Sequence, residues 1–167
     1  YLREGKYVLD KPLMLTSDDG NDSKELIIKN YPGEKTVLSS GIVLDLKWEK
    51  YKNGIMRAVV KGSPVMDMLF VNGELKSMAR YPNYDEKAVR FNGTSALATA
   101  PERVKKWKCP EGGYLHAMHK HDWGDFHYRI TGKNEKGELQ LEGGWQNNRP
   151  MGIHNENRMV ENIFEEL

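Results

Sequence analysis

The greatest concentration of side chains that could do chemistry lies between His116 and His127. Four histidines, two aspartates and Trp123 stand in this short segment. A tryptophan ring can stack on the C–H face of a sugar, while imidazoles and carboxylates bind the surrounding hydroxyl groups. We therefore predict a sugar-contact site made of His119, His121, Trp123 and Asp125. The alternative is structural, with Trp123 packed in the core and the histidines at a domain junction.

The same segment also invites a zinc interpretation. If a strand continues as far as His121, the side chains of His119 and His121 lie on one face, and Asp125 supplies a third ligand. Against this, Lys120 would repel a cation, and no cysteine stands in the segment. We therefore expect no metal in this protein, and no other cofactor.

A second polar segment follows the glycine pair at positions 143 and 144, where a strand should end in an exposed loop. Its tryptophan, amides and guanidinium suit hydrogen bonding to a polyol. They suit equally an interface with a neighbouring domain, in which amides satisfy backbone groups. The residues predicted to contact the glycan here are Trp145, Asn147, Asn148 and Arg149.

No catalytic residue is predicted within this chain. A glycosidase needs two carboxyl groups about 5–10 Å apart, one of them with a raised pKa. Asp122 and Asp125 are close in sequence, but nothing in the pattern indicates that either is buried. Glu161, Glu165 and Glu166 have the pattern of the solvated side of a helix. The sequence also lacks a Gly-x-Ser-x-Gly motif and a glycine-rich phosphate loop.

Composition excludes several classes of partner. The chain has 167 residues, with 25 Lys and Arg against 24 Asp and Glu, whereas nucleic-acid-binding domains usually carry a strong basic excess. No stretch reaches the ~18 apolar residues that a membrane-spanning helix needs. Cys109 is the single cysteine, so an internal disulfide is impossible. A reducing compartment and a secreted protein without disulfides are both compatible with this.

The first half of the chain has the pattern of short strands separated by turns. Strands are expected at residues 7–10, 13–16, 26–30 and 36–40, and residues 7–26 span about one coil of a parallel β-helix. An ordinary antiparallel meander is the alternative. Two hairpins should follow, one around Asn53-Gly54 and a stronger one around Asn72-Gly73, which joins residues 69–71 to residues 75–78.

The second half predicts one short helix among antiparallel strands. Residues 84–98 should be irregular. Thr99 and Glu102 form a capping-box pattern, so a helix should run to about Lys106 and present Val104 and Trp107 inward. Strands are expected at residues 114–119, 126–131 and 138–142, which implies a β-sandwich or barrel over residues 47–158. Residues 160–167 have helical spacing of their apolar positions.

Three stretches together resemble one family of carbohydrate-active proteins. They are residues 5–13 with 28–34, residues 69–83 with their strings FVNGE and ARYPN, and residues 143–150 followed by 160–167. In this order and spacing they are similar to the right-handed parallel β-helix proteins related to glycoside hydrolase family 141. In that family a β-domain is inserted between the first coil and the rest of the helix.

The resemblance implies a mainly β fold: a first coil of a right-handed parallel β-helix at residues 1–46, then an inserted antiparallel β-sandwich or barrel domain with one short helix at residues 47–158. Residues 159–167 would return toward the rest of the helix. It implies a secreted or periplasmic glycoside hydrolase of fucoside or xylan type, with its catalytic carboxylates on later coils. Because the sequence begins at Tyr1 and ends on an apolar pattern, we expect this chain to be a piece of a longer protein.

Three functional hypotheses stay open. In the first, the inserted domain lines the substrate cleft of the hydrolase, where its partners are a glycan and the remainder of its own β-helix. In the second, it is a non-catalytic carbohydrate-binding module. The third hypothesis is a structural cap that covers the apolar end of a solenoid.

Overall fold

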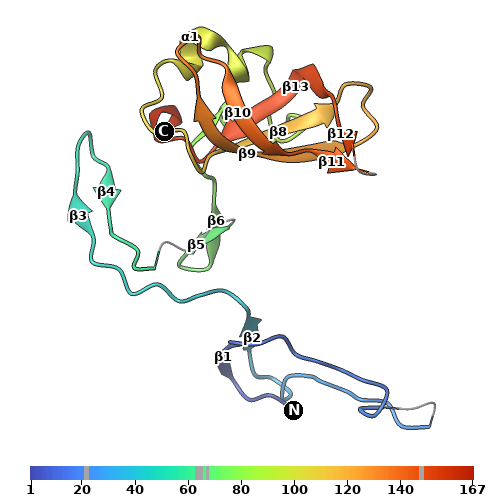
Figure 1. The fold of residues 1–167 in the computed structure, drawn as a ribbon. Helices are drawn as coiled ribbons and strands as arrows, with labels where there is room; N and C mark the ends of the chain where they lie inside the picture. The colour runs from blue at the N-terminus through green and yellow to red at the C-terminus, as the bar shows by residue number, and fades with distance from the viewer. Residues whose placement is uncertain (21–22, 63–65, 67, 147–148) are drawn as a thin grey trace. The chain divides into compact units, whose positions relative to one another are not determined.

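The computed structural model describes residues 1–20, 23–62, 66, 68–146 and 149–167. The chain divides into two compact units, Tyr1–Val65 (unit 1) and Met66–Leu167 (unit 2), which Figure 1 colours blue to green and green to red. Both are built mainly from strands, and one short α-helix lies in unit 2. The mainly β class with one short helix is therefore confirmed. The predicted domain limits after residues 46 and 158 stay predictions.

Unit 1 contains one parallel and one antiparallel pair of strands. Strand β1 (Gly5–Val8) runs parallel to β2 (Thr36–Ser39), with Gly5 opposite Thr36. Strands β3 (Glu49–Lys50) and β4 (Met56–Arg57) form the predicted hairpin. The parallel pairing contradicts an ordinary antiparallel meander for the first strands.

Two predicted strands of unit 1 are wrong. Residues 13–16 form no strand, and of residues 26–30 only Asn30 makes a bridge, to Leu2. The parallel partner of Tyr7 is Leu38 rather than a residue near Leu26. Apolar character favours a strand only where a second strand is available to accept its hydrogen bonds, and these segments have none in the described chain.

The described residues of unit 1 form no buried core. None of its described residues is buried, and apolar side chains of the parallel pair stand open to solvent, including Val8 (47% exposed) and Leu38 (47%). A two-stranded sheet is marginal in water by itself.

Unit 2 is organised around one five-stranded sheet with the order β10-β9-β8-β13-β7. All four neighbouring pairs are antiparallel. The strands are β7 (Arg80–Tyr81), β8 (Tyr114–His119), β9 (Asp125–Lys133), β10 (Leu139–Gly143) and β13 (Ile153–Glu161). The predicted strands at 114–119, 126–131 and 138–142 correspond to β8, β9 and β10.

Two hairpins complete the strands of unit 2. Strands β5 (Leu69–Val71) and β6 (Glu74–Lys76) meet at Asn72-Gly73. Both turn residues have φ in the left-handed region, 53° and 84°, as the sequence predicts for this pair. Strands β11 (Trp145–Gln146) and β12 (Arg149–Pro150) form the second hairpin, which follows the end of β10.

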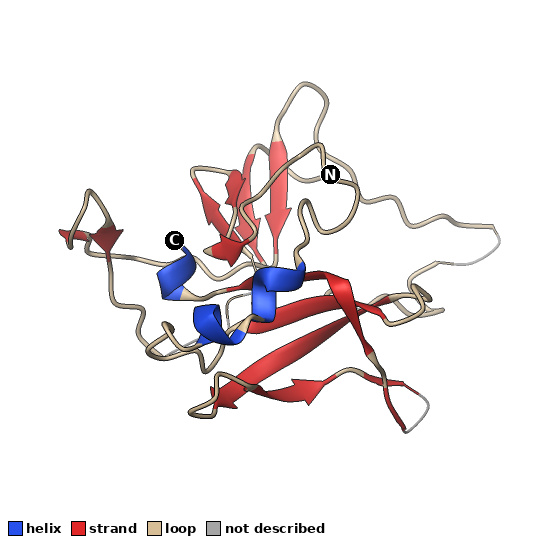
Figure 2. Ribbon diagram, turned by 90° about the horizontal axis from the view of Figure 1, so that it is seen from above, coloured by secondary structure: helices blue, strands red, loops and turns tan. Residues whose placement is uncertain are grey.

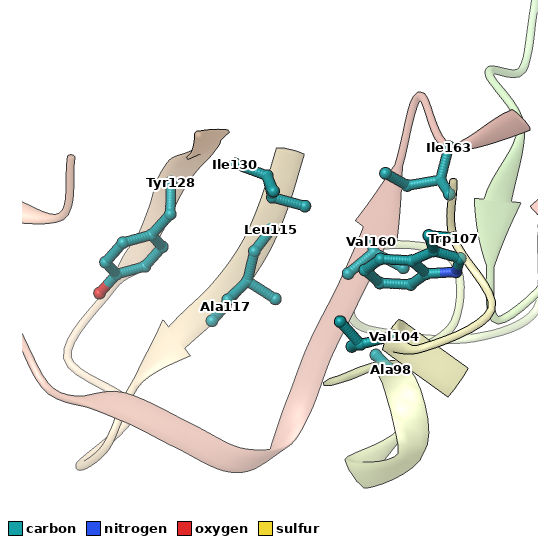
Figure 3. Packing of buried hydrophobic residues seen from close by; sticks show 9 residues of the cluster. All are labelled: Ala98, Val104, Trp107, Leu115, Ala117, Tyr128, Ile130, Val160 and Ile163. Carbon is teal, nitrogen blue, oxygen red and sulfur yellow. The ribbon is translucent and has the colours of Figure 1, made fainter. Parts of the chain in front are cut away.

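Short helical segments cover one face of the sheet and enclose the core (Figures 2 and 3). They are the 3-10 helix η1 (Ala96–Thr99), the helix α1 (Pro101–Val104) and the 3-10 helix η2 (Phe164–Glu166). Val104 and Trp107 are at most 1% exposed, as predicted, and pack with apolar side chains of the sheet. These include Leu115, Ile130 and Val160.

The prediction of a capping box at Thr99 is wrong, although a helix does follow it. The N-cap of α1 is Ala100, which makes no side-chain hydrogen bond, and Pro101 occupies the first turn. The side-chain cap lies earlier, where Ser95 accepts a hydrogen bond from the Leu97 amide at the start of η1. Thr99 cannot cap α1 from the last position of η1.

The predicted helix over residues 160–167 is also wrong in its first part. Val160 belongs to β13, where it lies opposite Leu115 on one side and Tyr81 on the other. Only Phe164–Glu166 is helical. The Glu166 carboxylate accepts hydrogen bonds from the Trp107 indole (2.7 Å) and from Arg103 (2.6 Å), and these bonds hold η2 beside α1.

The five-stranded sheet is open rather than closed, so the finer β-sandwich or barrel assignment stays a prediction. The same is true of the β-helix coil, for which the structure supplies one parallel pair. Within the described residues, no helix has the length and apolar character that crossing a membrane requires.

A single ammonium group ties α1 to the sheet. Lys133, at the end of β9, donates to the carbonyls of Val104 (3.0 Å), Lys105 (2.9 Å) and Trp107. These carbonyls lie at and just beyond the C-terminal end of α1, where the Val104 carbonyl also accepts from the Trp107 amide (3.1 Å). The three donors of one lysine bind all three carbonyls.

We predict that Lys133→Met lowers the free energy of unfolding of unit 2 by about 2 kcal/mol, because hydrogen bonds from a charged donor contribute about 1.5–3 kcal/mol. Urea denaturation followed by tryptophan fluorescence measures the change. Lys136→Met, at an exposed turn position, is the matched control and should be neutral. Equal stability of the two variants would contradict a structural role for Lys133.

Candidate functional site

The turn between β8 and β9 projects the predicted site from one end of the sheet. The His119 amide donates to the Gly124 carbonyl (2.8 Å), and the Asp122 amide donates to the His119 carbonyl (2.7 Å). Asp122 has φ of 57°, a conformation that aspartate tolerates better than most residues. This compact turn places residues 120–124 beyond the end of the strands.

Trp123 is braced on a buried imidazole. Its ring stacks on His119 with centroids 4.9 Å apart and 13° between the planes. His119 is 5% exposed, while Trp123 is 77% exposed. One face of the indole therefore rests on the protein, and the other is open to solvent. The alternative in which Trp123 packs in the core is wrong.

Two further rings complete the cluster. His121 lies 5.5 Å from Trp123 and 5.4 Å from His119, in tilted geometry. Phe126 makes an edge contact with His119 at 6.3 Å. The His121 amide donates to Nδ1 of His119 (3.2 Å), so that nitrogen acts as an acceptor. This geometry fixes the neutral tautomer with its proton on Nε2.

The electrostatic surroundings favour the same neutral state. Desolvation lowers the pKa of His119 below its ordinary value, and positive charge on His121, Lys120 and Arg149 lowers it further. Arg149 belongs to β12, so this hairpin lies within electrostatic range of the Trp123 turn. The structure therefore brings the rings of His119, His121 and Trp123 into contact. Arg149 lies within electrostatic range of His119.

The hairpin β11–β12 is held against the sheet by close backbone contacts. A Cβ built on Gly144 would lie 2.0 Å from the Tyr128 ring, so only glycine fits there. The Tyr128 hydroxyl donates to the Met151 carbonyl (3.2 Å), and the Lys120 amide donates to the Gly152 carbonyl (2.9 Å). Figure 1 shows β11 and β12 at the end of the sheet where β8 passes into β9.

The remaining predicted residues are placed differently. Trp145 is 65% exposed and lies opposite Pro150 in the hairpin. Asn147 and Asn148 lie outside the described residues. Asp125 pairs with Met118 in the sheet register, and its carboxylate lies 3.8 Å from His127. Because side chains alternate along a strand, Asp125 belongs to the face opposite that of His119.

That opposite face carries a cluster that the sequence analysis missed. Nε2 of His116 donates a hydrogen bond to the Glu161 carboxylate (2.7 Å), and the His127 ring lies 4.2 Å from the His116 ring. The hydrogen bond from His116 lowers the pKa of Glu161, and the charge of Arg80 lowers it further. Glu161 was predicted on a solvated helix. It lies instead in β13, with its side chain 22% exposed.

Arg80 is the buried cation of this face. It is 8% exposed and donates to the carbonyls of Pro82 (2.8 Å) and Gly93 (2.9 Å). Its guanidinium therefore fixes the irregular segment after β7 to the sheet. The pairing of His116 with His127 follows from the β8–β9 register, but Glu161 could join them only after β13 was placed beside β8.

The zinc interpretation gains no support. Among the described residues there is no group of three or more His, Cys, Asp or Glu side chains arranged to hold a metal ion. His119 and His121 lie close together, but Asp125 faces the other side of the sheet. The expectation of no other cofactor stays a prediction.

Unit 1 contains an open hollow of about 720 Å³ beside the parallel strand pair. Its lining combines the apolar side chains of Leu2, Ile28 and Leu38 with the charged side chains of Glu34 and Lys35. Glu34 is engaged by Arg3 (2.5 Å). The hollow is therefore part of the uncovered apolar surface of unit 1.

No family model matches the sequence, and neither a curated protein nor a solved structure is significantly similar to it. The resemblance to the glycoside hydrolase family thus rests on the three sequence stretches.

We predict that the His119 imidazole titrates below the ordinary histidine pKa of about 6.5. Because the unfolded chain then binds the proton more readily, unit 2 loses stability as pH falls through that value. An NMR titration of the ring protons measures the midpoint. Arg149→Gln should raise it, and the control Lys136→Gln should not. A wild-type midpoint at or above 6.5 would contradict this account.

Proposed function

We propose that unit 2 is a glycan-binding surface in a secreted or periplasmic β-helix glycoside hydrolase of fucoside or xylan type. The observation that carries this proposal is the open face of Trp123, held in place by its stack on His119. The glycan stacks on this face, and His121 and Arg149 bind its hydroxyl groups.

The exposure of Trp123 favours binding over a purely structural role. Burying apolar surface stabilises a fold by about 25 cal/mol per Å², and Trp123 leaves most of its ring in water. The stack on a buried imidazole removes rotational freedom from the indole before any ligand arrives. A rigid platform loses less conformational entropy on binding, which favours affinity.

The contribution of this chain is binding rather than turnover. Its best-defined acid–base pair, His116 with Glu161, lies on the opposite sheet face from His119 and Trp123. The catalytic carboxylates of the hydrolase would lie on further coils of its β-helix. In this proposal the Trp123 surface forms one wall of the substrate cleft.

Unit 1 supplies the observation that favours a β-helix. Its first two strands are parallel, and parallel sheets normally have both faces covered. Here the side chains of Val8, Val37 and Leu38 are each more than 40% exposed. We propose that this pair is the first rung of the helix, and that further coils of the same protein cover it.

A non-catalytic binding module is the second candidate. It shares the Trp123 surface and differs only in lacking a hydrolase beside it. A structural cap is the third candidate, and it predicts that replacing Trp123 impairs folding rather than binding.

We predict that Trp123→Ala reduces glycan affinity at least about tenfold, because the ring supplies the apolar contact. Affinity electrophoresis against xylan and fucose-containing polysaccharides measures binding, and circular dichroism confirms folding. Trp145→Ala should give a smaller loss, since no stacking partner braces that ring in the described structure.

Trp48→Ala is the matched control, because Trp48 is an exposed tryptophan (54%) that belongs to unit 1. It should leave binding unchanged. Failure of the wild-type chain to bind any glycan would refute the proposed function. Loss of folding in Trp123→Ala would favour the structural cap.

We also predict that amide hydrogens of β1 and β2 exchange at least about a hundredfold faster than those of β8 and β9, because among the described residues only unit 2 has a buried core. Hydrogen–deuterium exchange with mass spectrometry compares the two units within one sample. Equal protection would mean that unit 1 is stable without further coils, against the first-rung proposal.

A further inference from the structure

Two cationic side chains, those of Lys120 and Arg149, lie near the Trp123 platform. Lys120 lies in the same turn as Trp123, and Arg149 lies in the adjoining hairpin β11–β12. Each is close enough to His119 to act on its charge. Neither Lys120 nor Arg149 makes a side-chain hydrogen bond or ion pair with the part of the chain that the structure describes.

The position of Lys120 is defined by packing. Its amide donates to the Gly152 carbonyl, and a Cβ built on Gly152 would lie 2.7 Å from Cδ of Lys120. The aliphatic stem therefore lies against the Gly152 backbone, where any larger residue would displace it. This contact ties the lysine to the same segment that carries Arg149.

The nearby carboxylates do not balance these charges. Asp122 is bound by Arg90 (2.6 Å) and lies 3.8 Å from His154. Its pKa is lowered chiefly by the Arg90 hydrogen bond. Asp125 belongs to the opposite face, beside His127. The whole chain carries a formal net charge of only +1. The positive charge near Trp123 is therefore a local excess rather than a property of the whole chain.

We infer that the surface binds a glycan bearing anionic groups, a carboxylate or a sulfate ester on the sugar. Trp123 stacks on the sugar ring, while Lys120 and Arg149 pair with the anion. This inference rests on the proposed glycan-binding function and adds the charge of the ligand to it. An arginine is suited to this role because its planar fork matches carboxylate and sulfate oxygens.

The test compares three polysaccharides by isothermal titration calorimetry: polygalacturonate for the carboxylate, a sulfated galactan for the sulfate ester, and xylan as the neutral ligand. We expect the wild-type chain to bind one of the anionic polymers at least about tenfold more tightly than xylan. Its affinity should fall as salt rises from 50 to 500 mM, because mobile ions screen exposed charge pairs.

The double variant Lys120→Gln with Arg149→Gln should lose that preference and keep its affinity for xylan. The control double variant, Lys87→Gln with Lys136→Gln, removes the same charge from exposed positions elsewhere in unit 2 and should retain the preference. Circular dichroism of both variants verifies folding.

Four results would overturn the inference. Equal, salt-independent affinity for xylan and both anionic polymers would leave glycan binding standing and remove the anionic preference. Equal loss in the two double variants would mean that net charge alone acts. Tighter binding of single-stranded DNA than of any glycan would assign the surface to nucleic acid. Failure to bind any polysaccharide would refute the proposed function itself.

Discussion

The structure of unit 2 depends on the burial of one sheet face beneath a very short helix. Val104 at the end of α1 and Trp107 just after it pack with Leu115 and Val160, and all four side chains are almost completely inaccessible to water. Once this face is covered, strand alternation decides the position of every other side chain in β8 and β9. His119 then lies on the covered face at the end of β8, where it can support Trp123.

The aromatic cluster combines a buried support with an exposed platform. His119 is desolvated and holds a neutral tautomer, so it does not need a counterion beneath the indole. The sequence predicted that His119, His121 and Trp123 meet, since they lie in one turn. It did not predict that Asp125 lies on the opposite face of the sheet, because the face of Asp125 depends on where β9 begins and thus on the strand register.

The two units differ in how they bury apolar surface. In unit 2 the central strands of the sheet are hydrogen-bonded to a neighbouring strand on each side, and one face of the sheet is covered by the core. Unit 1 has comparable apolar side chains in β1 and β2, but they face solvent. The first-rung proposal connects the two observations, because a parallel strand pair gains most of its stability when further layers remove its side chains from water.

The sequence by itself determined the features that depend on near neighbours along the chain. These are the Asn72-Gly73 turn, the alternation that defines β8, and the inward positions of Val104 and Trp107. Only the tertiary structure decided that residues 153–161 form a strand between β8 and β7, which brings Glu161 to His116. Strand pairing joins residues far apart in sequence, so helical spacing at residues 160–167 was a local preference that burial in the sheet overrode.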